Sequence, residues 1–305
     1  MSNENKKYDN SSEFSSENKV KLKNENLSEY LKSKLINEKS TLYKDIKVKS
    51  LNFSINDLKD NVKFLVENKG NEIKKMNENE LPKCGKVVFI ICNPYFNTDY
   101  KLGNPVCNDC KMIAKLYKHH DYKCYCLFDG YKEDFIRYLK FFVSNEYEDL
   151  IIYYSGHGME IEKDIYKFDY DLNKFVYSNK NENSESEDEC LIFKNEKNEG
   201  INIIIDDELT YYINLNKSKH ILVICDCCHC GTILDKIPKN CCCISSCLDE
   251  EQSIQISTGG IFTYYLVKYF NYEIENLVKN IDMRIERFKQ HPILSNNSKR
   301  QYLYL

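Results

Sequence analysis

The sequence has no long apolar run: no stretch of its 305 residues reaches the roughly 18 apolar residues that a membrane-spanning helix requires. Its first segment, MSNENKK, also lacks the apolar region of a secretion signal. From these two absences we expect a cytoplasmic protein that does not have a membrane as its partner.

The chain also has no excess of positive charge. The chain has 43 lysines and arginines against 47 aspartates and glutamates, which gives a formal net charge of −4. Lysine and glutamate are interspersed, so no segment offers the basic face on which binding to a phosphate backbone depends. We therefore expect no nucleic acid among the partners. Tryptophan is also absent, and this absence carries no functional signal.

Cysteine, by contrast, is plentiful, with 15 residues in the chain. Such a number in a short secreted protein would indicate a disulfide framework. In a chain of 305 residues without a secretion signal, it indicates reduced thiols instead. The cysteines are therefore candidates for metal binding or for nucleophilic catalysis.

Residues 1–80 have the composition of an N-terminal extension. Asn, Ser, Glu and Lys dominate residues 1–26, which have almost nothing to bury and should be disordered. Two short helices are predicted after them, because apolar residues recur at helical spacing: Leu27, Leu31 and Leu35, then Ile55, Leu58, Val62 and Leu65. The polar residues 71–80 indicate a linker to the main domain.

Residues 81–305 alternate between strand and helix patterns. The predicted strands are 87–92, 122–128, 149–154, 191–193, 201–205, 221–224 and 240–246, and the predicted helices are 112–117, 135–143, 207–215, 260–270 and 274–288. This alternation predicts an α/β domain, with a mainly parallel β-sheet flanked by helices on both faces. Residues 159–187 are charged and aperiodic, and they predict a mobile surface insertion.

Two of the buried strands end in reactive side chains. The strand at 221–224 leads into the sequence DCCHCG at 226–231, and the strand at 149–154 leads into SGHG at 155–158. Ligands and chemistry gather at the carboxyl ends of parallel strands. A catalytic thiol needs a partner base, because the thiolate is the species that attacks. Together the two motifs predict a Cys/His pair.

These two motifs resemble those of the metacaspases, type I-like caspase-related cysteine peptidases of non-animal lineages. The metacaspase motifs are SGHG and DSCHSG, so Cys227 and Cys230 stand where that family has serines. The resemblance extends from about residue 85 to residue 305. It implies a caspase-like fold and a cysteine endopeptidase whose partners are protein or peptide substrates, and we expect a monomer.

The resemblance also implies roles within the two motifs. Cys228, third in its motif, would be the nucleophile, and His157 would hold the thiolate and later protonate the leaving amine. The backbone N–H groups of Gly158 and Cys228 would stabilise the oxyanion. His229 is interpreted as structural, because the side chain next to the nucleophile in sequence should point elsewhere.

Acidic residues near the nucleophile imply a preference for basic substrates. Metacaspases accept Arg or Lys before the scissile bond, and the matching pocket positions by resemblance are Asp226, Ser155 and Asp109. Asp109 has a second interpretation, as a residue at the start of the helix that follows it.

The resemblance further implies a Ca²⁺ site that activates the peptidase. The matching positions are Asp188, Asp206, Asp207 and Asp235, and carboxylate oxygens are ligands that Ca²⁺ prefers. Simpler interpretations exist as well. Asp206 and Asp207 could serve the start of the helix at 207–215, and Asp188 lies in a solvated acidic run.

Two other functions compete with this hypothesis. The cysteine pairs at 107/110, 225/228 and 227/230 have the CxxC spacing of zinc ligands. Adjacent cysteines on a strand point to opposite sides, however, so not all of them can reach one metal. The second alternative is a catalytically silent caspase-like protein that acts as a Ca²⁺-responsive interaction module. The thiols at 227 and 230 favour it, because a thiol is a weaker hydrogen-bond donor than a hydroxyl.

Overall fold

A computed structural model of the chain describes residues 28–36, 62–69, 72–162, 166–169, 174–177, 187–195, 200–234 and 236–305. The predicted disorder of residues 1–26 lies outside the described residues, as do Ile55 and Leu58 of the second predicted helix. Asp235 and parts of the predicted insertion also lie outside them.

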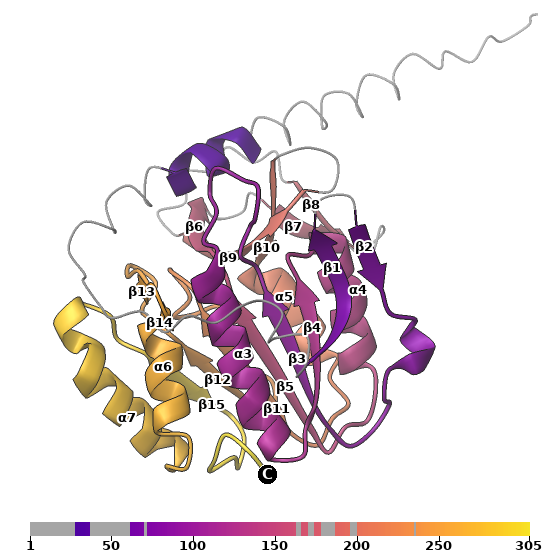
Figure 1. Cartoon of the computed structure of the whole chain (residues 1–305), viewed down its shortest axis with the longest axis vertical. Coiled ribbons are helices and arrows are strands. Elements are labelled where there is room, and N and C mark those ends of the chain that lie inside the picture. Colours follow the sequence, from indigo (N-terminus) through magenta and orange to yellow (C-terminus); the bar gives the residue numbers. More distant parts are fainter. Residues whose placement is uncertain are drawn as a thin grey trace, which may run out of the picture.

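The core of the molecule is a sheet of eight strands. They are β1 (Lys63–Lys69), β2 (Glu72–Lys75), β3 (Lys86–Cys92), β4 (Lys123–Phe128), β5 (Asp149–Ser155), β11 (Ile221–Asp226), β12 (Cys241–Ser245) and β15 (Ile293–Asn296). Their order across the sheet is β15-β12-β11-β5-β3-β4-β1-β2 (Figure 1). The strands from β12 to β1 are parallel, and the edge strands β15 and β2 are antiparallel to their neighbours.

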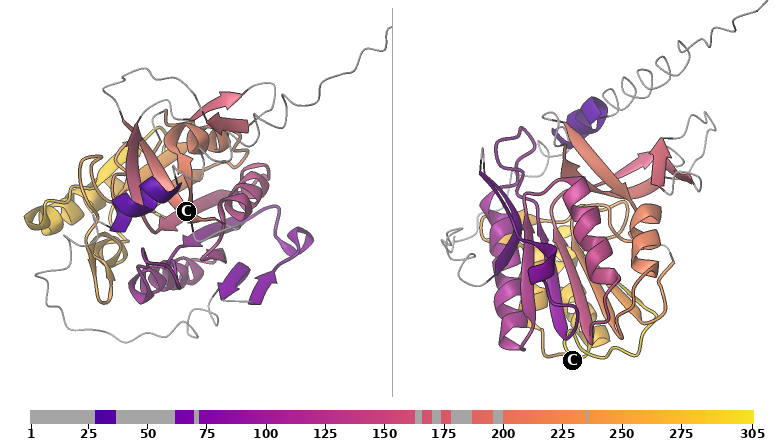
Figure 2. Two further views of the ribbon diagram at one scale, coloured as in Figure 1. Left: turned by 90° about the horizontal axis from the view of Figure 1, so that it is seen from above. Right: turned by 90° about the vertical axis from the view of Figure 1, so that its right-hand side faces the viewer.

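Both faces of this sheet are buried, because its central strands are apolar at almost every position. In β3, Phe89 and Ile91 face one hydrophobic cluster, whereas Val88 and Ile90 face the other. The first face is covered by α4 (Lys132–Val143) and α5 (Asp206–Asn214), and the second by α3 (Asn104–His119), α6 (Ile261–Lys268) and α7 (Ile274–Ile285) (Figure 2). The predicted α/β architecture, with a mainly parallel sheet and helices on both faces, is confirmed.

A smaller antiparallel sheet stands at the carboxyl end of the parallel strands (Figure 1). It consists of β6 (Gly158–Glu162), β9 (Glu187–Lys194) and β10 (Ile201–Ile205). The helix over residues 28–36 packs on this sheet through Leu31 and Leu35. Ser28 Oγ donates to the Ile201 carbonyl at 3.1 Å and accepts the Ile201 N–H at 2.8 Å. The helix that we predicted from the leucine spacing is therefore present, and it reaches the end of the fold where the motifs lie.

The remaining elements are short. Two hairpins pair β7 (Tyr166–Asp169) with β8 (Lys174–Tyr177) and β13 (Gln255–Ile256) with β14 (Gly259–Gly260), and η1 (Glu78–Glu80) and η2 (Glu286–Phe288) are 3-10 turns. The absence of regular structure that we expected for residues 159–187 is wrong for β6, for the β7–β8 hairpin and for the start of β9. Strand β6 forms because it pairs with β9, with Gly158 opposite Leu191 and Glu160 opposite Glu189. The sequence pattern of one segment does not show such pairing with another segment.

The helix predicted to include Val62 and Leu65 is wrong from residue 63 onward. That segment is β1, and it joins the main sheet beside β4. The ladder shifts between Phe64 and Val66, so that Leu65 and Val66 face the same cluster although they are adjacent. This irregularity hides the two-residue period of the strand and leaves an apolar spacing that imitates a helix. The main sheet therefore includes strands that precede residue 81.

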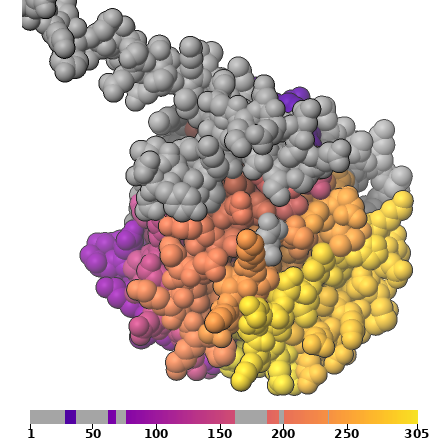
Figure 3. Space-filling model, turned by 180° about the vertical axis from the view of Figure 1, so that it is seen from behind, coloured from indigo at the N-terminus to yellow at the C-terminus, as the bar shows by residue number. Residues whose placement is uncertain are grey.

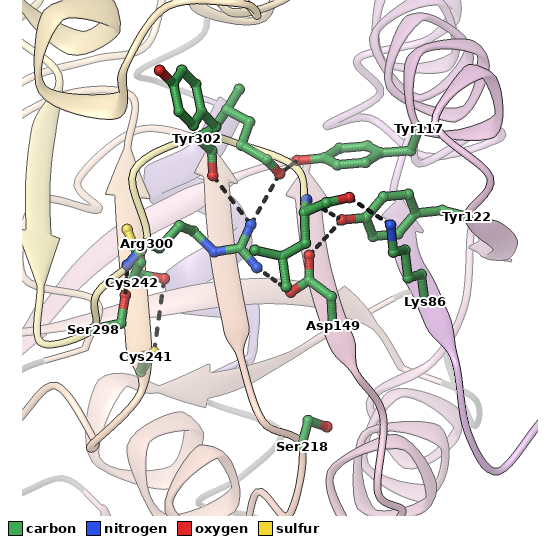
Figure 4. A network of polar contacts seen from close by, with 12 residues as sticks. Lys86, Tyr117, Tyr122, Asp149, Ser218, Cys241, Cys242, Ser298, Arg300 and Tyr302 are labelled. Carbon is green, nitrogen blue, oxygen red and sulfur yellow. Dashed lines mark hydrogen bonds and ion pairs between the residues drawn. The ribbon is translucent and has the colours of Figure 1, made fainter.

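The end of the chain is fixed near the amino ends of β3 and β5, opposite the motifs. Arg300 forms a buried ion pair with Asp149 and donates to the Leu303 carbonyl at 3.1 Å (Figure 4). Tyr122 donates to the other oxygen of the Asp149 carboxylate and accepts the Leu305 N–H at 3.0 Å. Seen from behind, the orange to yellow C-terminal third forms much of the described surface (Figure 3). Across the described ranges, no helix is both long and apolar enough to cross a membrane.

Candidate active site

Neighbouring strands end level with one another at the edge of the sheet where the motifs lie. In the ladder of β3, β5 and β11, Cys92 pairs with Ser155, and Ser155 pairs with Asp226. His157 and Cys228 each follow two residues after these paired positions, so their strands deliver them side by side. One cleft is lined by all six residues to which we assigned catalytic or substrate-binding roles: Asp109, Ser155, His157, Gly158, Asp226 and Cys228.

The His157 ring is held in one orientation by two tyrosines. Its Nε2 atom lies 2.7 Å from the carbonyl oxygen of Tyr100, and its ring packs on Tyr95 with 4.9 Å between centroids. The Tyr95 hydroxyl also accepts the backbone N–H of His157 at 2.9 Å. Because a carbonyl only accepts, Nε2 carries the proton, and Nδ1 is the nitrogen that carries the lone pair in the neutral ring. His157 is thereby set up to accept a proton at Nδ1.

Cys228 is the cysteine of its motif that solvent can reach. All fifteen cysteines are free thiols; Cys228 is partly exposed and Cys84 is exposed, while the other cysteines are buried. Cys227 and Cys230 are 2% and 0% exposed, and burial raises the pKa of the Cys227 thiol. A thiol that is this deeply buried cannot reach a substrate, and a thiol that stays protonated, such as Cys227, is a poor nucleophile. Solvent exposure therefore favours Cys228 as the candidate nucleophile, as does its position in the motif.

Gly158 has no room for a side chain, because the segment that contains Cys227 and Cys228 lies against it. A Cβ atom at this position would lie 2.0 Å from the Cys228 carbonyl oxygen and 3.1 Å from Cys227 Sγ. Gly156 is similarly confined, since its Cβ would lie 2.7 Å from the Tyr154 hydroxyl. The two glycines allow the backbone around His157 to approach the Cys228 segment closely.

Asp226 and Asp109 form an acidic floor in the cleft. Ser253 Oγ and Thr263 Oγ1 donate to the Asp226 carboxylate at 2.7 and 2.6 Å, and the Gly260 N–H donates to both oxygens of Asp109 at 2.8 and 2.9 Å. Burial raises the pKa of Asp226 to about 6. Burial, together with the charge of Asp226, raises the pKa of Asp109. Within the described part of the chain, neither carboxylate forms an ion pair with a lysine or arginine; their partners are hydroxyls and a backbone N–H.

Asp109 lies within a helix and not at its start. Helix α3 begins at Asn104, so Asp109 is in the second turn, and its carboxylate faces the β13–β14 hairpin. A Cβ atom at Gly259 would lie 2.2 Å from Asp109 Oδ1, and one at Gly260 would lie 2.4 Å from Asp226 Oδ2. The helix-start interpretation of Asp109 is therefore wrong, and the hairpin lies directly on the acidic floor.

Comparison with known proteins places this geometry in a family. A family model of the caspase domain matches residues 85–304. The chain belongs to the caspase domain family. A crystal structure of a protein from Geobacter sulfurreducens has a TM-score of 0.52 at 16% identity, and the match covers 73% of this chain and 98% of that chain, which supports the fold alone. No curated protein matches the chain. Family membership supports a cysteine-type peptidase that acts on protein substrates.

The candidate Ca²⁺ ligands of this caspase domain are only partly assembled within the described residues. Asp188 and Asp206 are buried, and after burial itself their charges raise the pKa of the nearby Cys190 thiol. Asp207 is exposed on α5, and Asp235 is outside the described residues. In the described part of the chain, no three acidic, histidine or cysteine side chains form a group that could hold a metal. The zinc hypothesis therefore gains no support.

Sequence reasoning missed the groups that brace this site. Gln290 is 0% exposed; it accepts the Ile254 N–H at 2.9 Å and donates to the Ser246 carbonyl at 2.9 Å and to Ser253 Oγ at 3.2 Å. A single glutamine carries no local signal of such a role. The carbonyl of Tyr100 carries none either, because every residue has a backbone carbonyl.

For two residues beside the cleft, Leu35 and His229, the sequence predicted only part of what the structure shows. Leu35 of the 28–36 helix lines the cleft, and its helical spacing predicted the helix but not its place. His229 was interpreted as structural, and its Nδ1 atom lies 2.5 Å from the Asp249 carbonyl oxygen. His229 also has a positive φ of 50°, which places the bend of the chain directly after Cys228.

Proposed function

We propose that this caspase domain is a cysteine endopeptidase of the metacaspase type, which cleaves after Arg or Lys through Cys228 and His157. The observation that supports it is the convergence of a partly exposed thiol, an oriented imidazole and a pair of buried carboxylates in one cleft. The thiol attacks, the imidazole transfers the proton, and the carboxylates recognise a cation.

The reaction is acyl transfer to sulfur followed by hydrolysis. Cys228 Sγ attacks the scissile carbonyl carbon as its proton passes to His157 Nδ1, and the N–H groups of Gly158 and Cys228 stabilise the oxyanion. When the C–N bond breaks, His157 returns that proton to the leaving amine, and a thioester remains on Cys228. Water then attacks the thioester with His157 as the base, which releases the carboxylic acid and restores the thiol.

Specificity for a basic side chain follows from the acidic floor. Asp226 and Asp109 are 6% and 1% exposed, and a buried carboxylate without a cation is costly. An Arg or Lys side chain would supply the cation. A substrate without one would leave desolvated charge unpaired, which is the situation in which discrimination is strongest.

Turnover of short fluorogenic peptides that end in Arg, Lys or Asp tests this function. The Arg and Lys peptides should be cleaved and the Asp peptide should not. Cys228→Ala should abolish cleavage, whereas Cys227→Ser and Cys230→Ser should keep most of it. An active Cys228→Ala variant beside an inactive Cys227→Ser variant would refute the assignment. Failure to cleave any peptide would favour the silent interaction module.

We also propose that Ca²⁺ promotes this activity. The candidate ligands are Asp188, Asp206, Asp207 and Asp235. Thr232, in the segment that leaves the nucleophile, donates to Glu189 Oε2 at 3.0 Å, and Glu189 adjoins Asp188. An ion held near Asp188 would therefore steady one wall of the cleft. A chelator should lower turnover without unfolding the protein, and Asp206→Ala should raise the Ca²⁺ concentration required. Unchanged turnover in chelator would contradict this.

A further inference from the structure

One backbone carbonyl beneath the nucleophile is surrounded by hydrogen-bond donors. The Cys227 carbonyl oxygen lies 2.9 Å from Ser246 Oγ, 3.0 Å from Cys230 Sγ and 3.3 Å from Cys247 Sγ. The Ser246 hydroxyl also accepts the Cys227 N–H at 3.2 Å. These residues are at most 2% exposed. A carbonyl oxygen has two lone pairs, so three donors saturate it.

This arrangement fixes the direction of the next N–H group. The Cys227–Cys228 peptide bond is trans, so the Cys227 carbonyl and the Cys228 N–H point in opposite directions. The carbonyl points to the buried donors, and the N–H therefore points away from them, to the side of the cleft that Cys228 and Gly158 line. In the reaction described above, that N–H is one of the two oxyanion donors.

Building on the proposed function, we propose that Ser246, Cys230 and Cys247 are positioning residues, which aim the oxyanion-binding N–H of Cys228 by holding the Cys227 carbonyl. Rotation of this peptide would take the buried carbonyl away from all three donors and leave it unpaired, which is strongly unfavourable. Such preorganised donors act because they do not have to reorient as charge develops.

Ser246 is suited to this role because its own backbone is fixed on both sides. Its N–H donates to the Cys225 carbonyl at 2.9 Å, and its carbonyl accepts from Gln290 Nε2 at 2.9 Å. The Cys247 thiol can assist because it keeps its proton: contact with Cys230 and burial raise the pKa of Cys247. For Cys230, burial is outweighed by hydrogen bonds with Cys227, Cys247 and Ser246, which lower its pKa, so its role as a donor rests on the geometry. At 3.0 Å from a carbonyl oxygen, the Cys230 sulfur also has to be the donor.

The test compares Ser246→Ala with Ser245→Ala in a Cys84→Ser background. Ser245 is the adjacent residue of β12, is 1% exposed, and contacts Cys243 Sγ rather than Cys227. Ser246→Ala should lower kcat for the Arg peptide roughly 10- to 100-fold with little change in KM, since loss of a whole oxyanion donor costs about 10²- to 10³-fold. Ser245→Ala should leave both constants near the wild-type values.

A second measurement distinguishes a misdirected Cys228 N–H from a general loss of reactivity at the site. Iodoacetamide alkylates a thiolate without forming an oxyanion, so the alkylation rate of Cys228 should be the same in wild type and Ser246→Ala. The Cys84→Ser background removes the one exposed competing thiol. Equal losses of kcat and alkylation rate, or a Ser246→Ala variant as active as Ser245→Ala, would overturn the proposal.

Two further experiments test the proposal if Ser246→Ala does not fold or if the wild type is inactive. Cys230→Ala should lower kcat while Cys230→Ser, which retains a donor, should not, and this comparison decides the matter if Ser246→Ala does not fold. If the wild type cleaves no peptide, the proposed function is wrong. A crystal structure of Ser246→Ala then tests the positioning role on its own. A rotated Cys227 carbonyl supports it, and an unchanged one overturns it.

Discussion

At the scale of single residues, the acidic floor shows a conflict between stability and function. Asp226 and Asp109 are buried side by side, and burial is the main cause that raises the pKa of each. Buried Asp149, by contrast, is paired with Arg300 at the other end of the sheet. Groups with strongly shifted pKa values and no structural partner gather at functional sites. The lack of an ion-pair partner for Asp226 and Asp109 therefore supports the proposal that a substrate supplies the cation.

The pKa of Asp226 predicts a pH dependence of specificity. Below about 6 this carboxyl is protonated and loses its attraction for a cation, so kcat/KM for an Arg peptide should fall as pH decreases through that value. Titration of the Cys/His pair would affect every substrate, so the quantity to measure is the ratio of kcat/KM for an Arg peptide to that for a Gln peptide. The ratio should rise with pH in wild type and rise less in Asp226→Asn, in which Asp109 is the remaining carboxyl of the floor. A flat wild-type ratio would exclude Asp226 from cation recognition.

The same shift predicts an effect of opposite sign on stability. A folded pKa of about 6, against 3.8 for an unperturbed group, means that the folded state binds the proton more tightly than the unfolded state does. This contribution to stability is complete below the unfolded pKa and is lost as pH rises through about 6. Asp226→Asn should therefore be more stable than wild type at pH 8, by up to about 3 kcal/mol at 1.36 kcal/mol per pKa unit, and the difference should vanish near pH 4. Urea unfolding at both pH values measures this, and a less stable variant at pH 8 would contradict it.

At the scale of elements, the sequence predicted the parts whose signal is local. The apolar runs of β3, β5 and β11, with reactive residues directly after two of them, were enough to place His157 and Cys228 at one edge of a parallel sheet. The strand β1 was missed because a ladder irregularity disguises its period. The hairpin β13–β14 was missed because its role depends on long-range contact: Gly260 meets Asp109 across 151 positions of the chain.

Gln290 joins two elements of the site, which predicts a measurable role for it. Gln290→Met keeps the approximate size of the side chain but removes its hydrogen bonds to Ser246, Ser253 and Ile254. Ser253 also donates to Asp226, so we expect a looser acidic floor and a KM for Arg peptides raised several-fold. Gln301→Met, at an exposed position, is the matched control. Equal KM values for the two variants would show that Gln290 does not support the pocket.

At the scale of the whole molecule, chemistry and anchoring occupy opposite ends of one sheet. The carboxyl ends of β5 and β11 lead to the cleft, while the amino ends of β3 and β5 hold the last residues of the chain (Figure 4). The buried Arg300–Asp149 pair connects the tail to the first residue of β5. A fold divided in this way should allow its stability to be changed without a change in its chemistry.

The tail anchor tests that division. Arg300→Met would leave Asp149 buried without its cation, and breaking a buried pair from one side costs about 3–5 kcal/mol in free energy of unfolding. The paired variant Asp149→Leu with Arg300→Met removes both charges and should recover most of that loss, because two desolvated ions are replaced by apolar packing. Urea unfolding of the two variants measures the difference. At temperatures at which Arg300→Met remains folded, its kcat for the Arg peptide should equal that of wild type, since its contacts lie at the far end of the sheet from Cys228. A single variant that loses less than about 1 kcal/mol, or a folded one with reduced kcat, would show that the two ends are not independent.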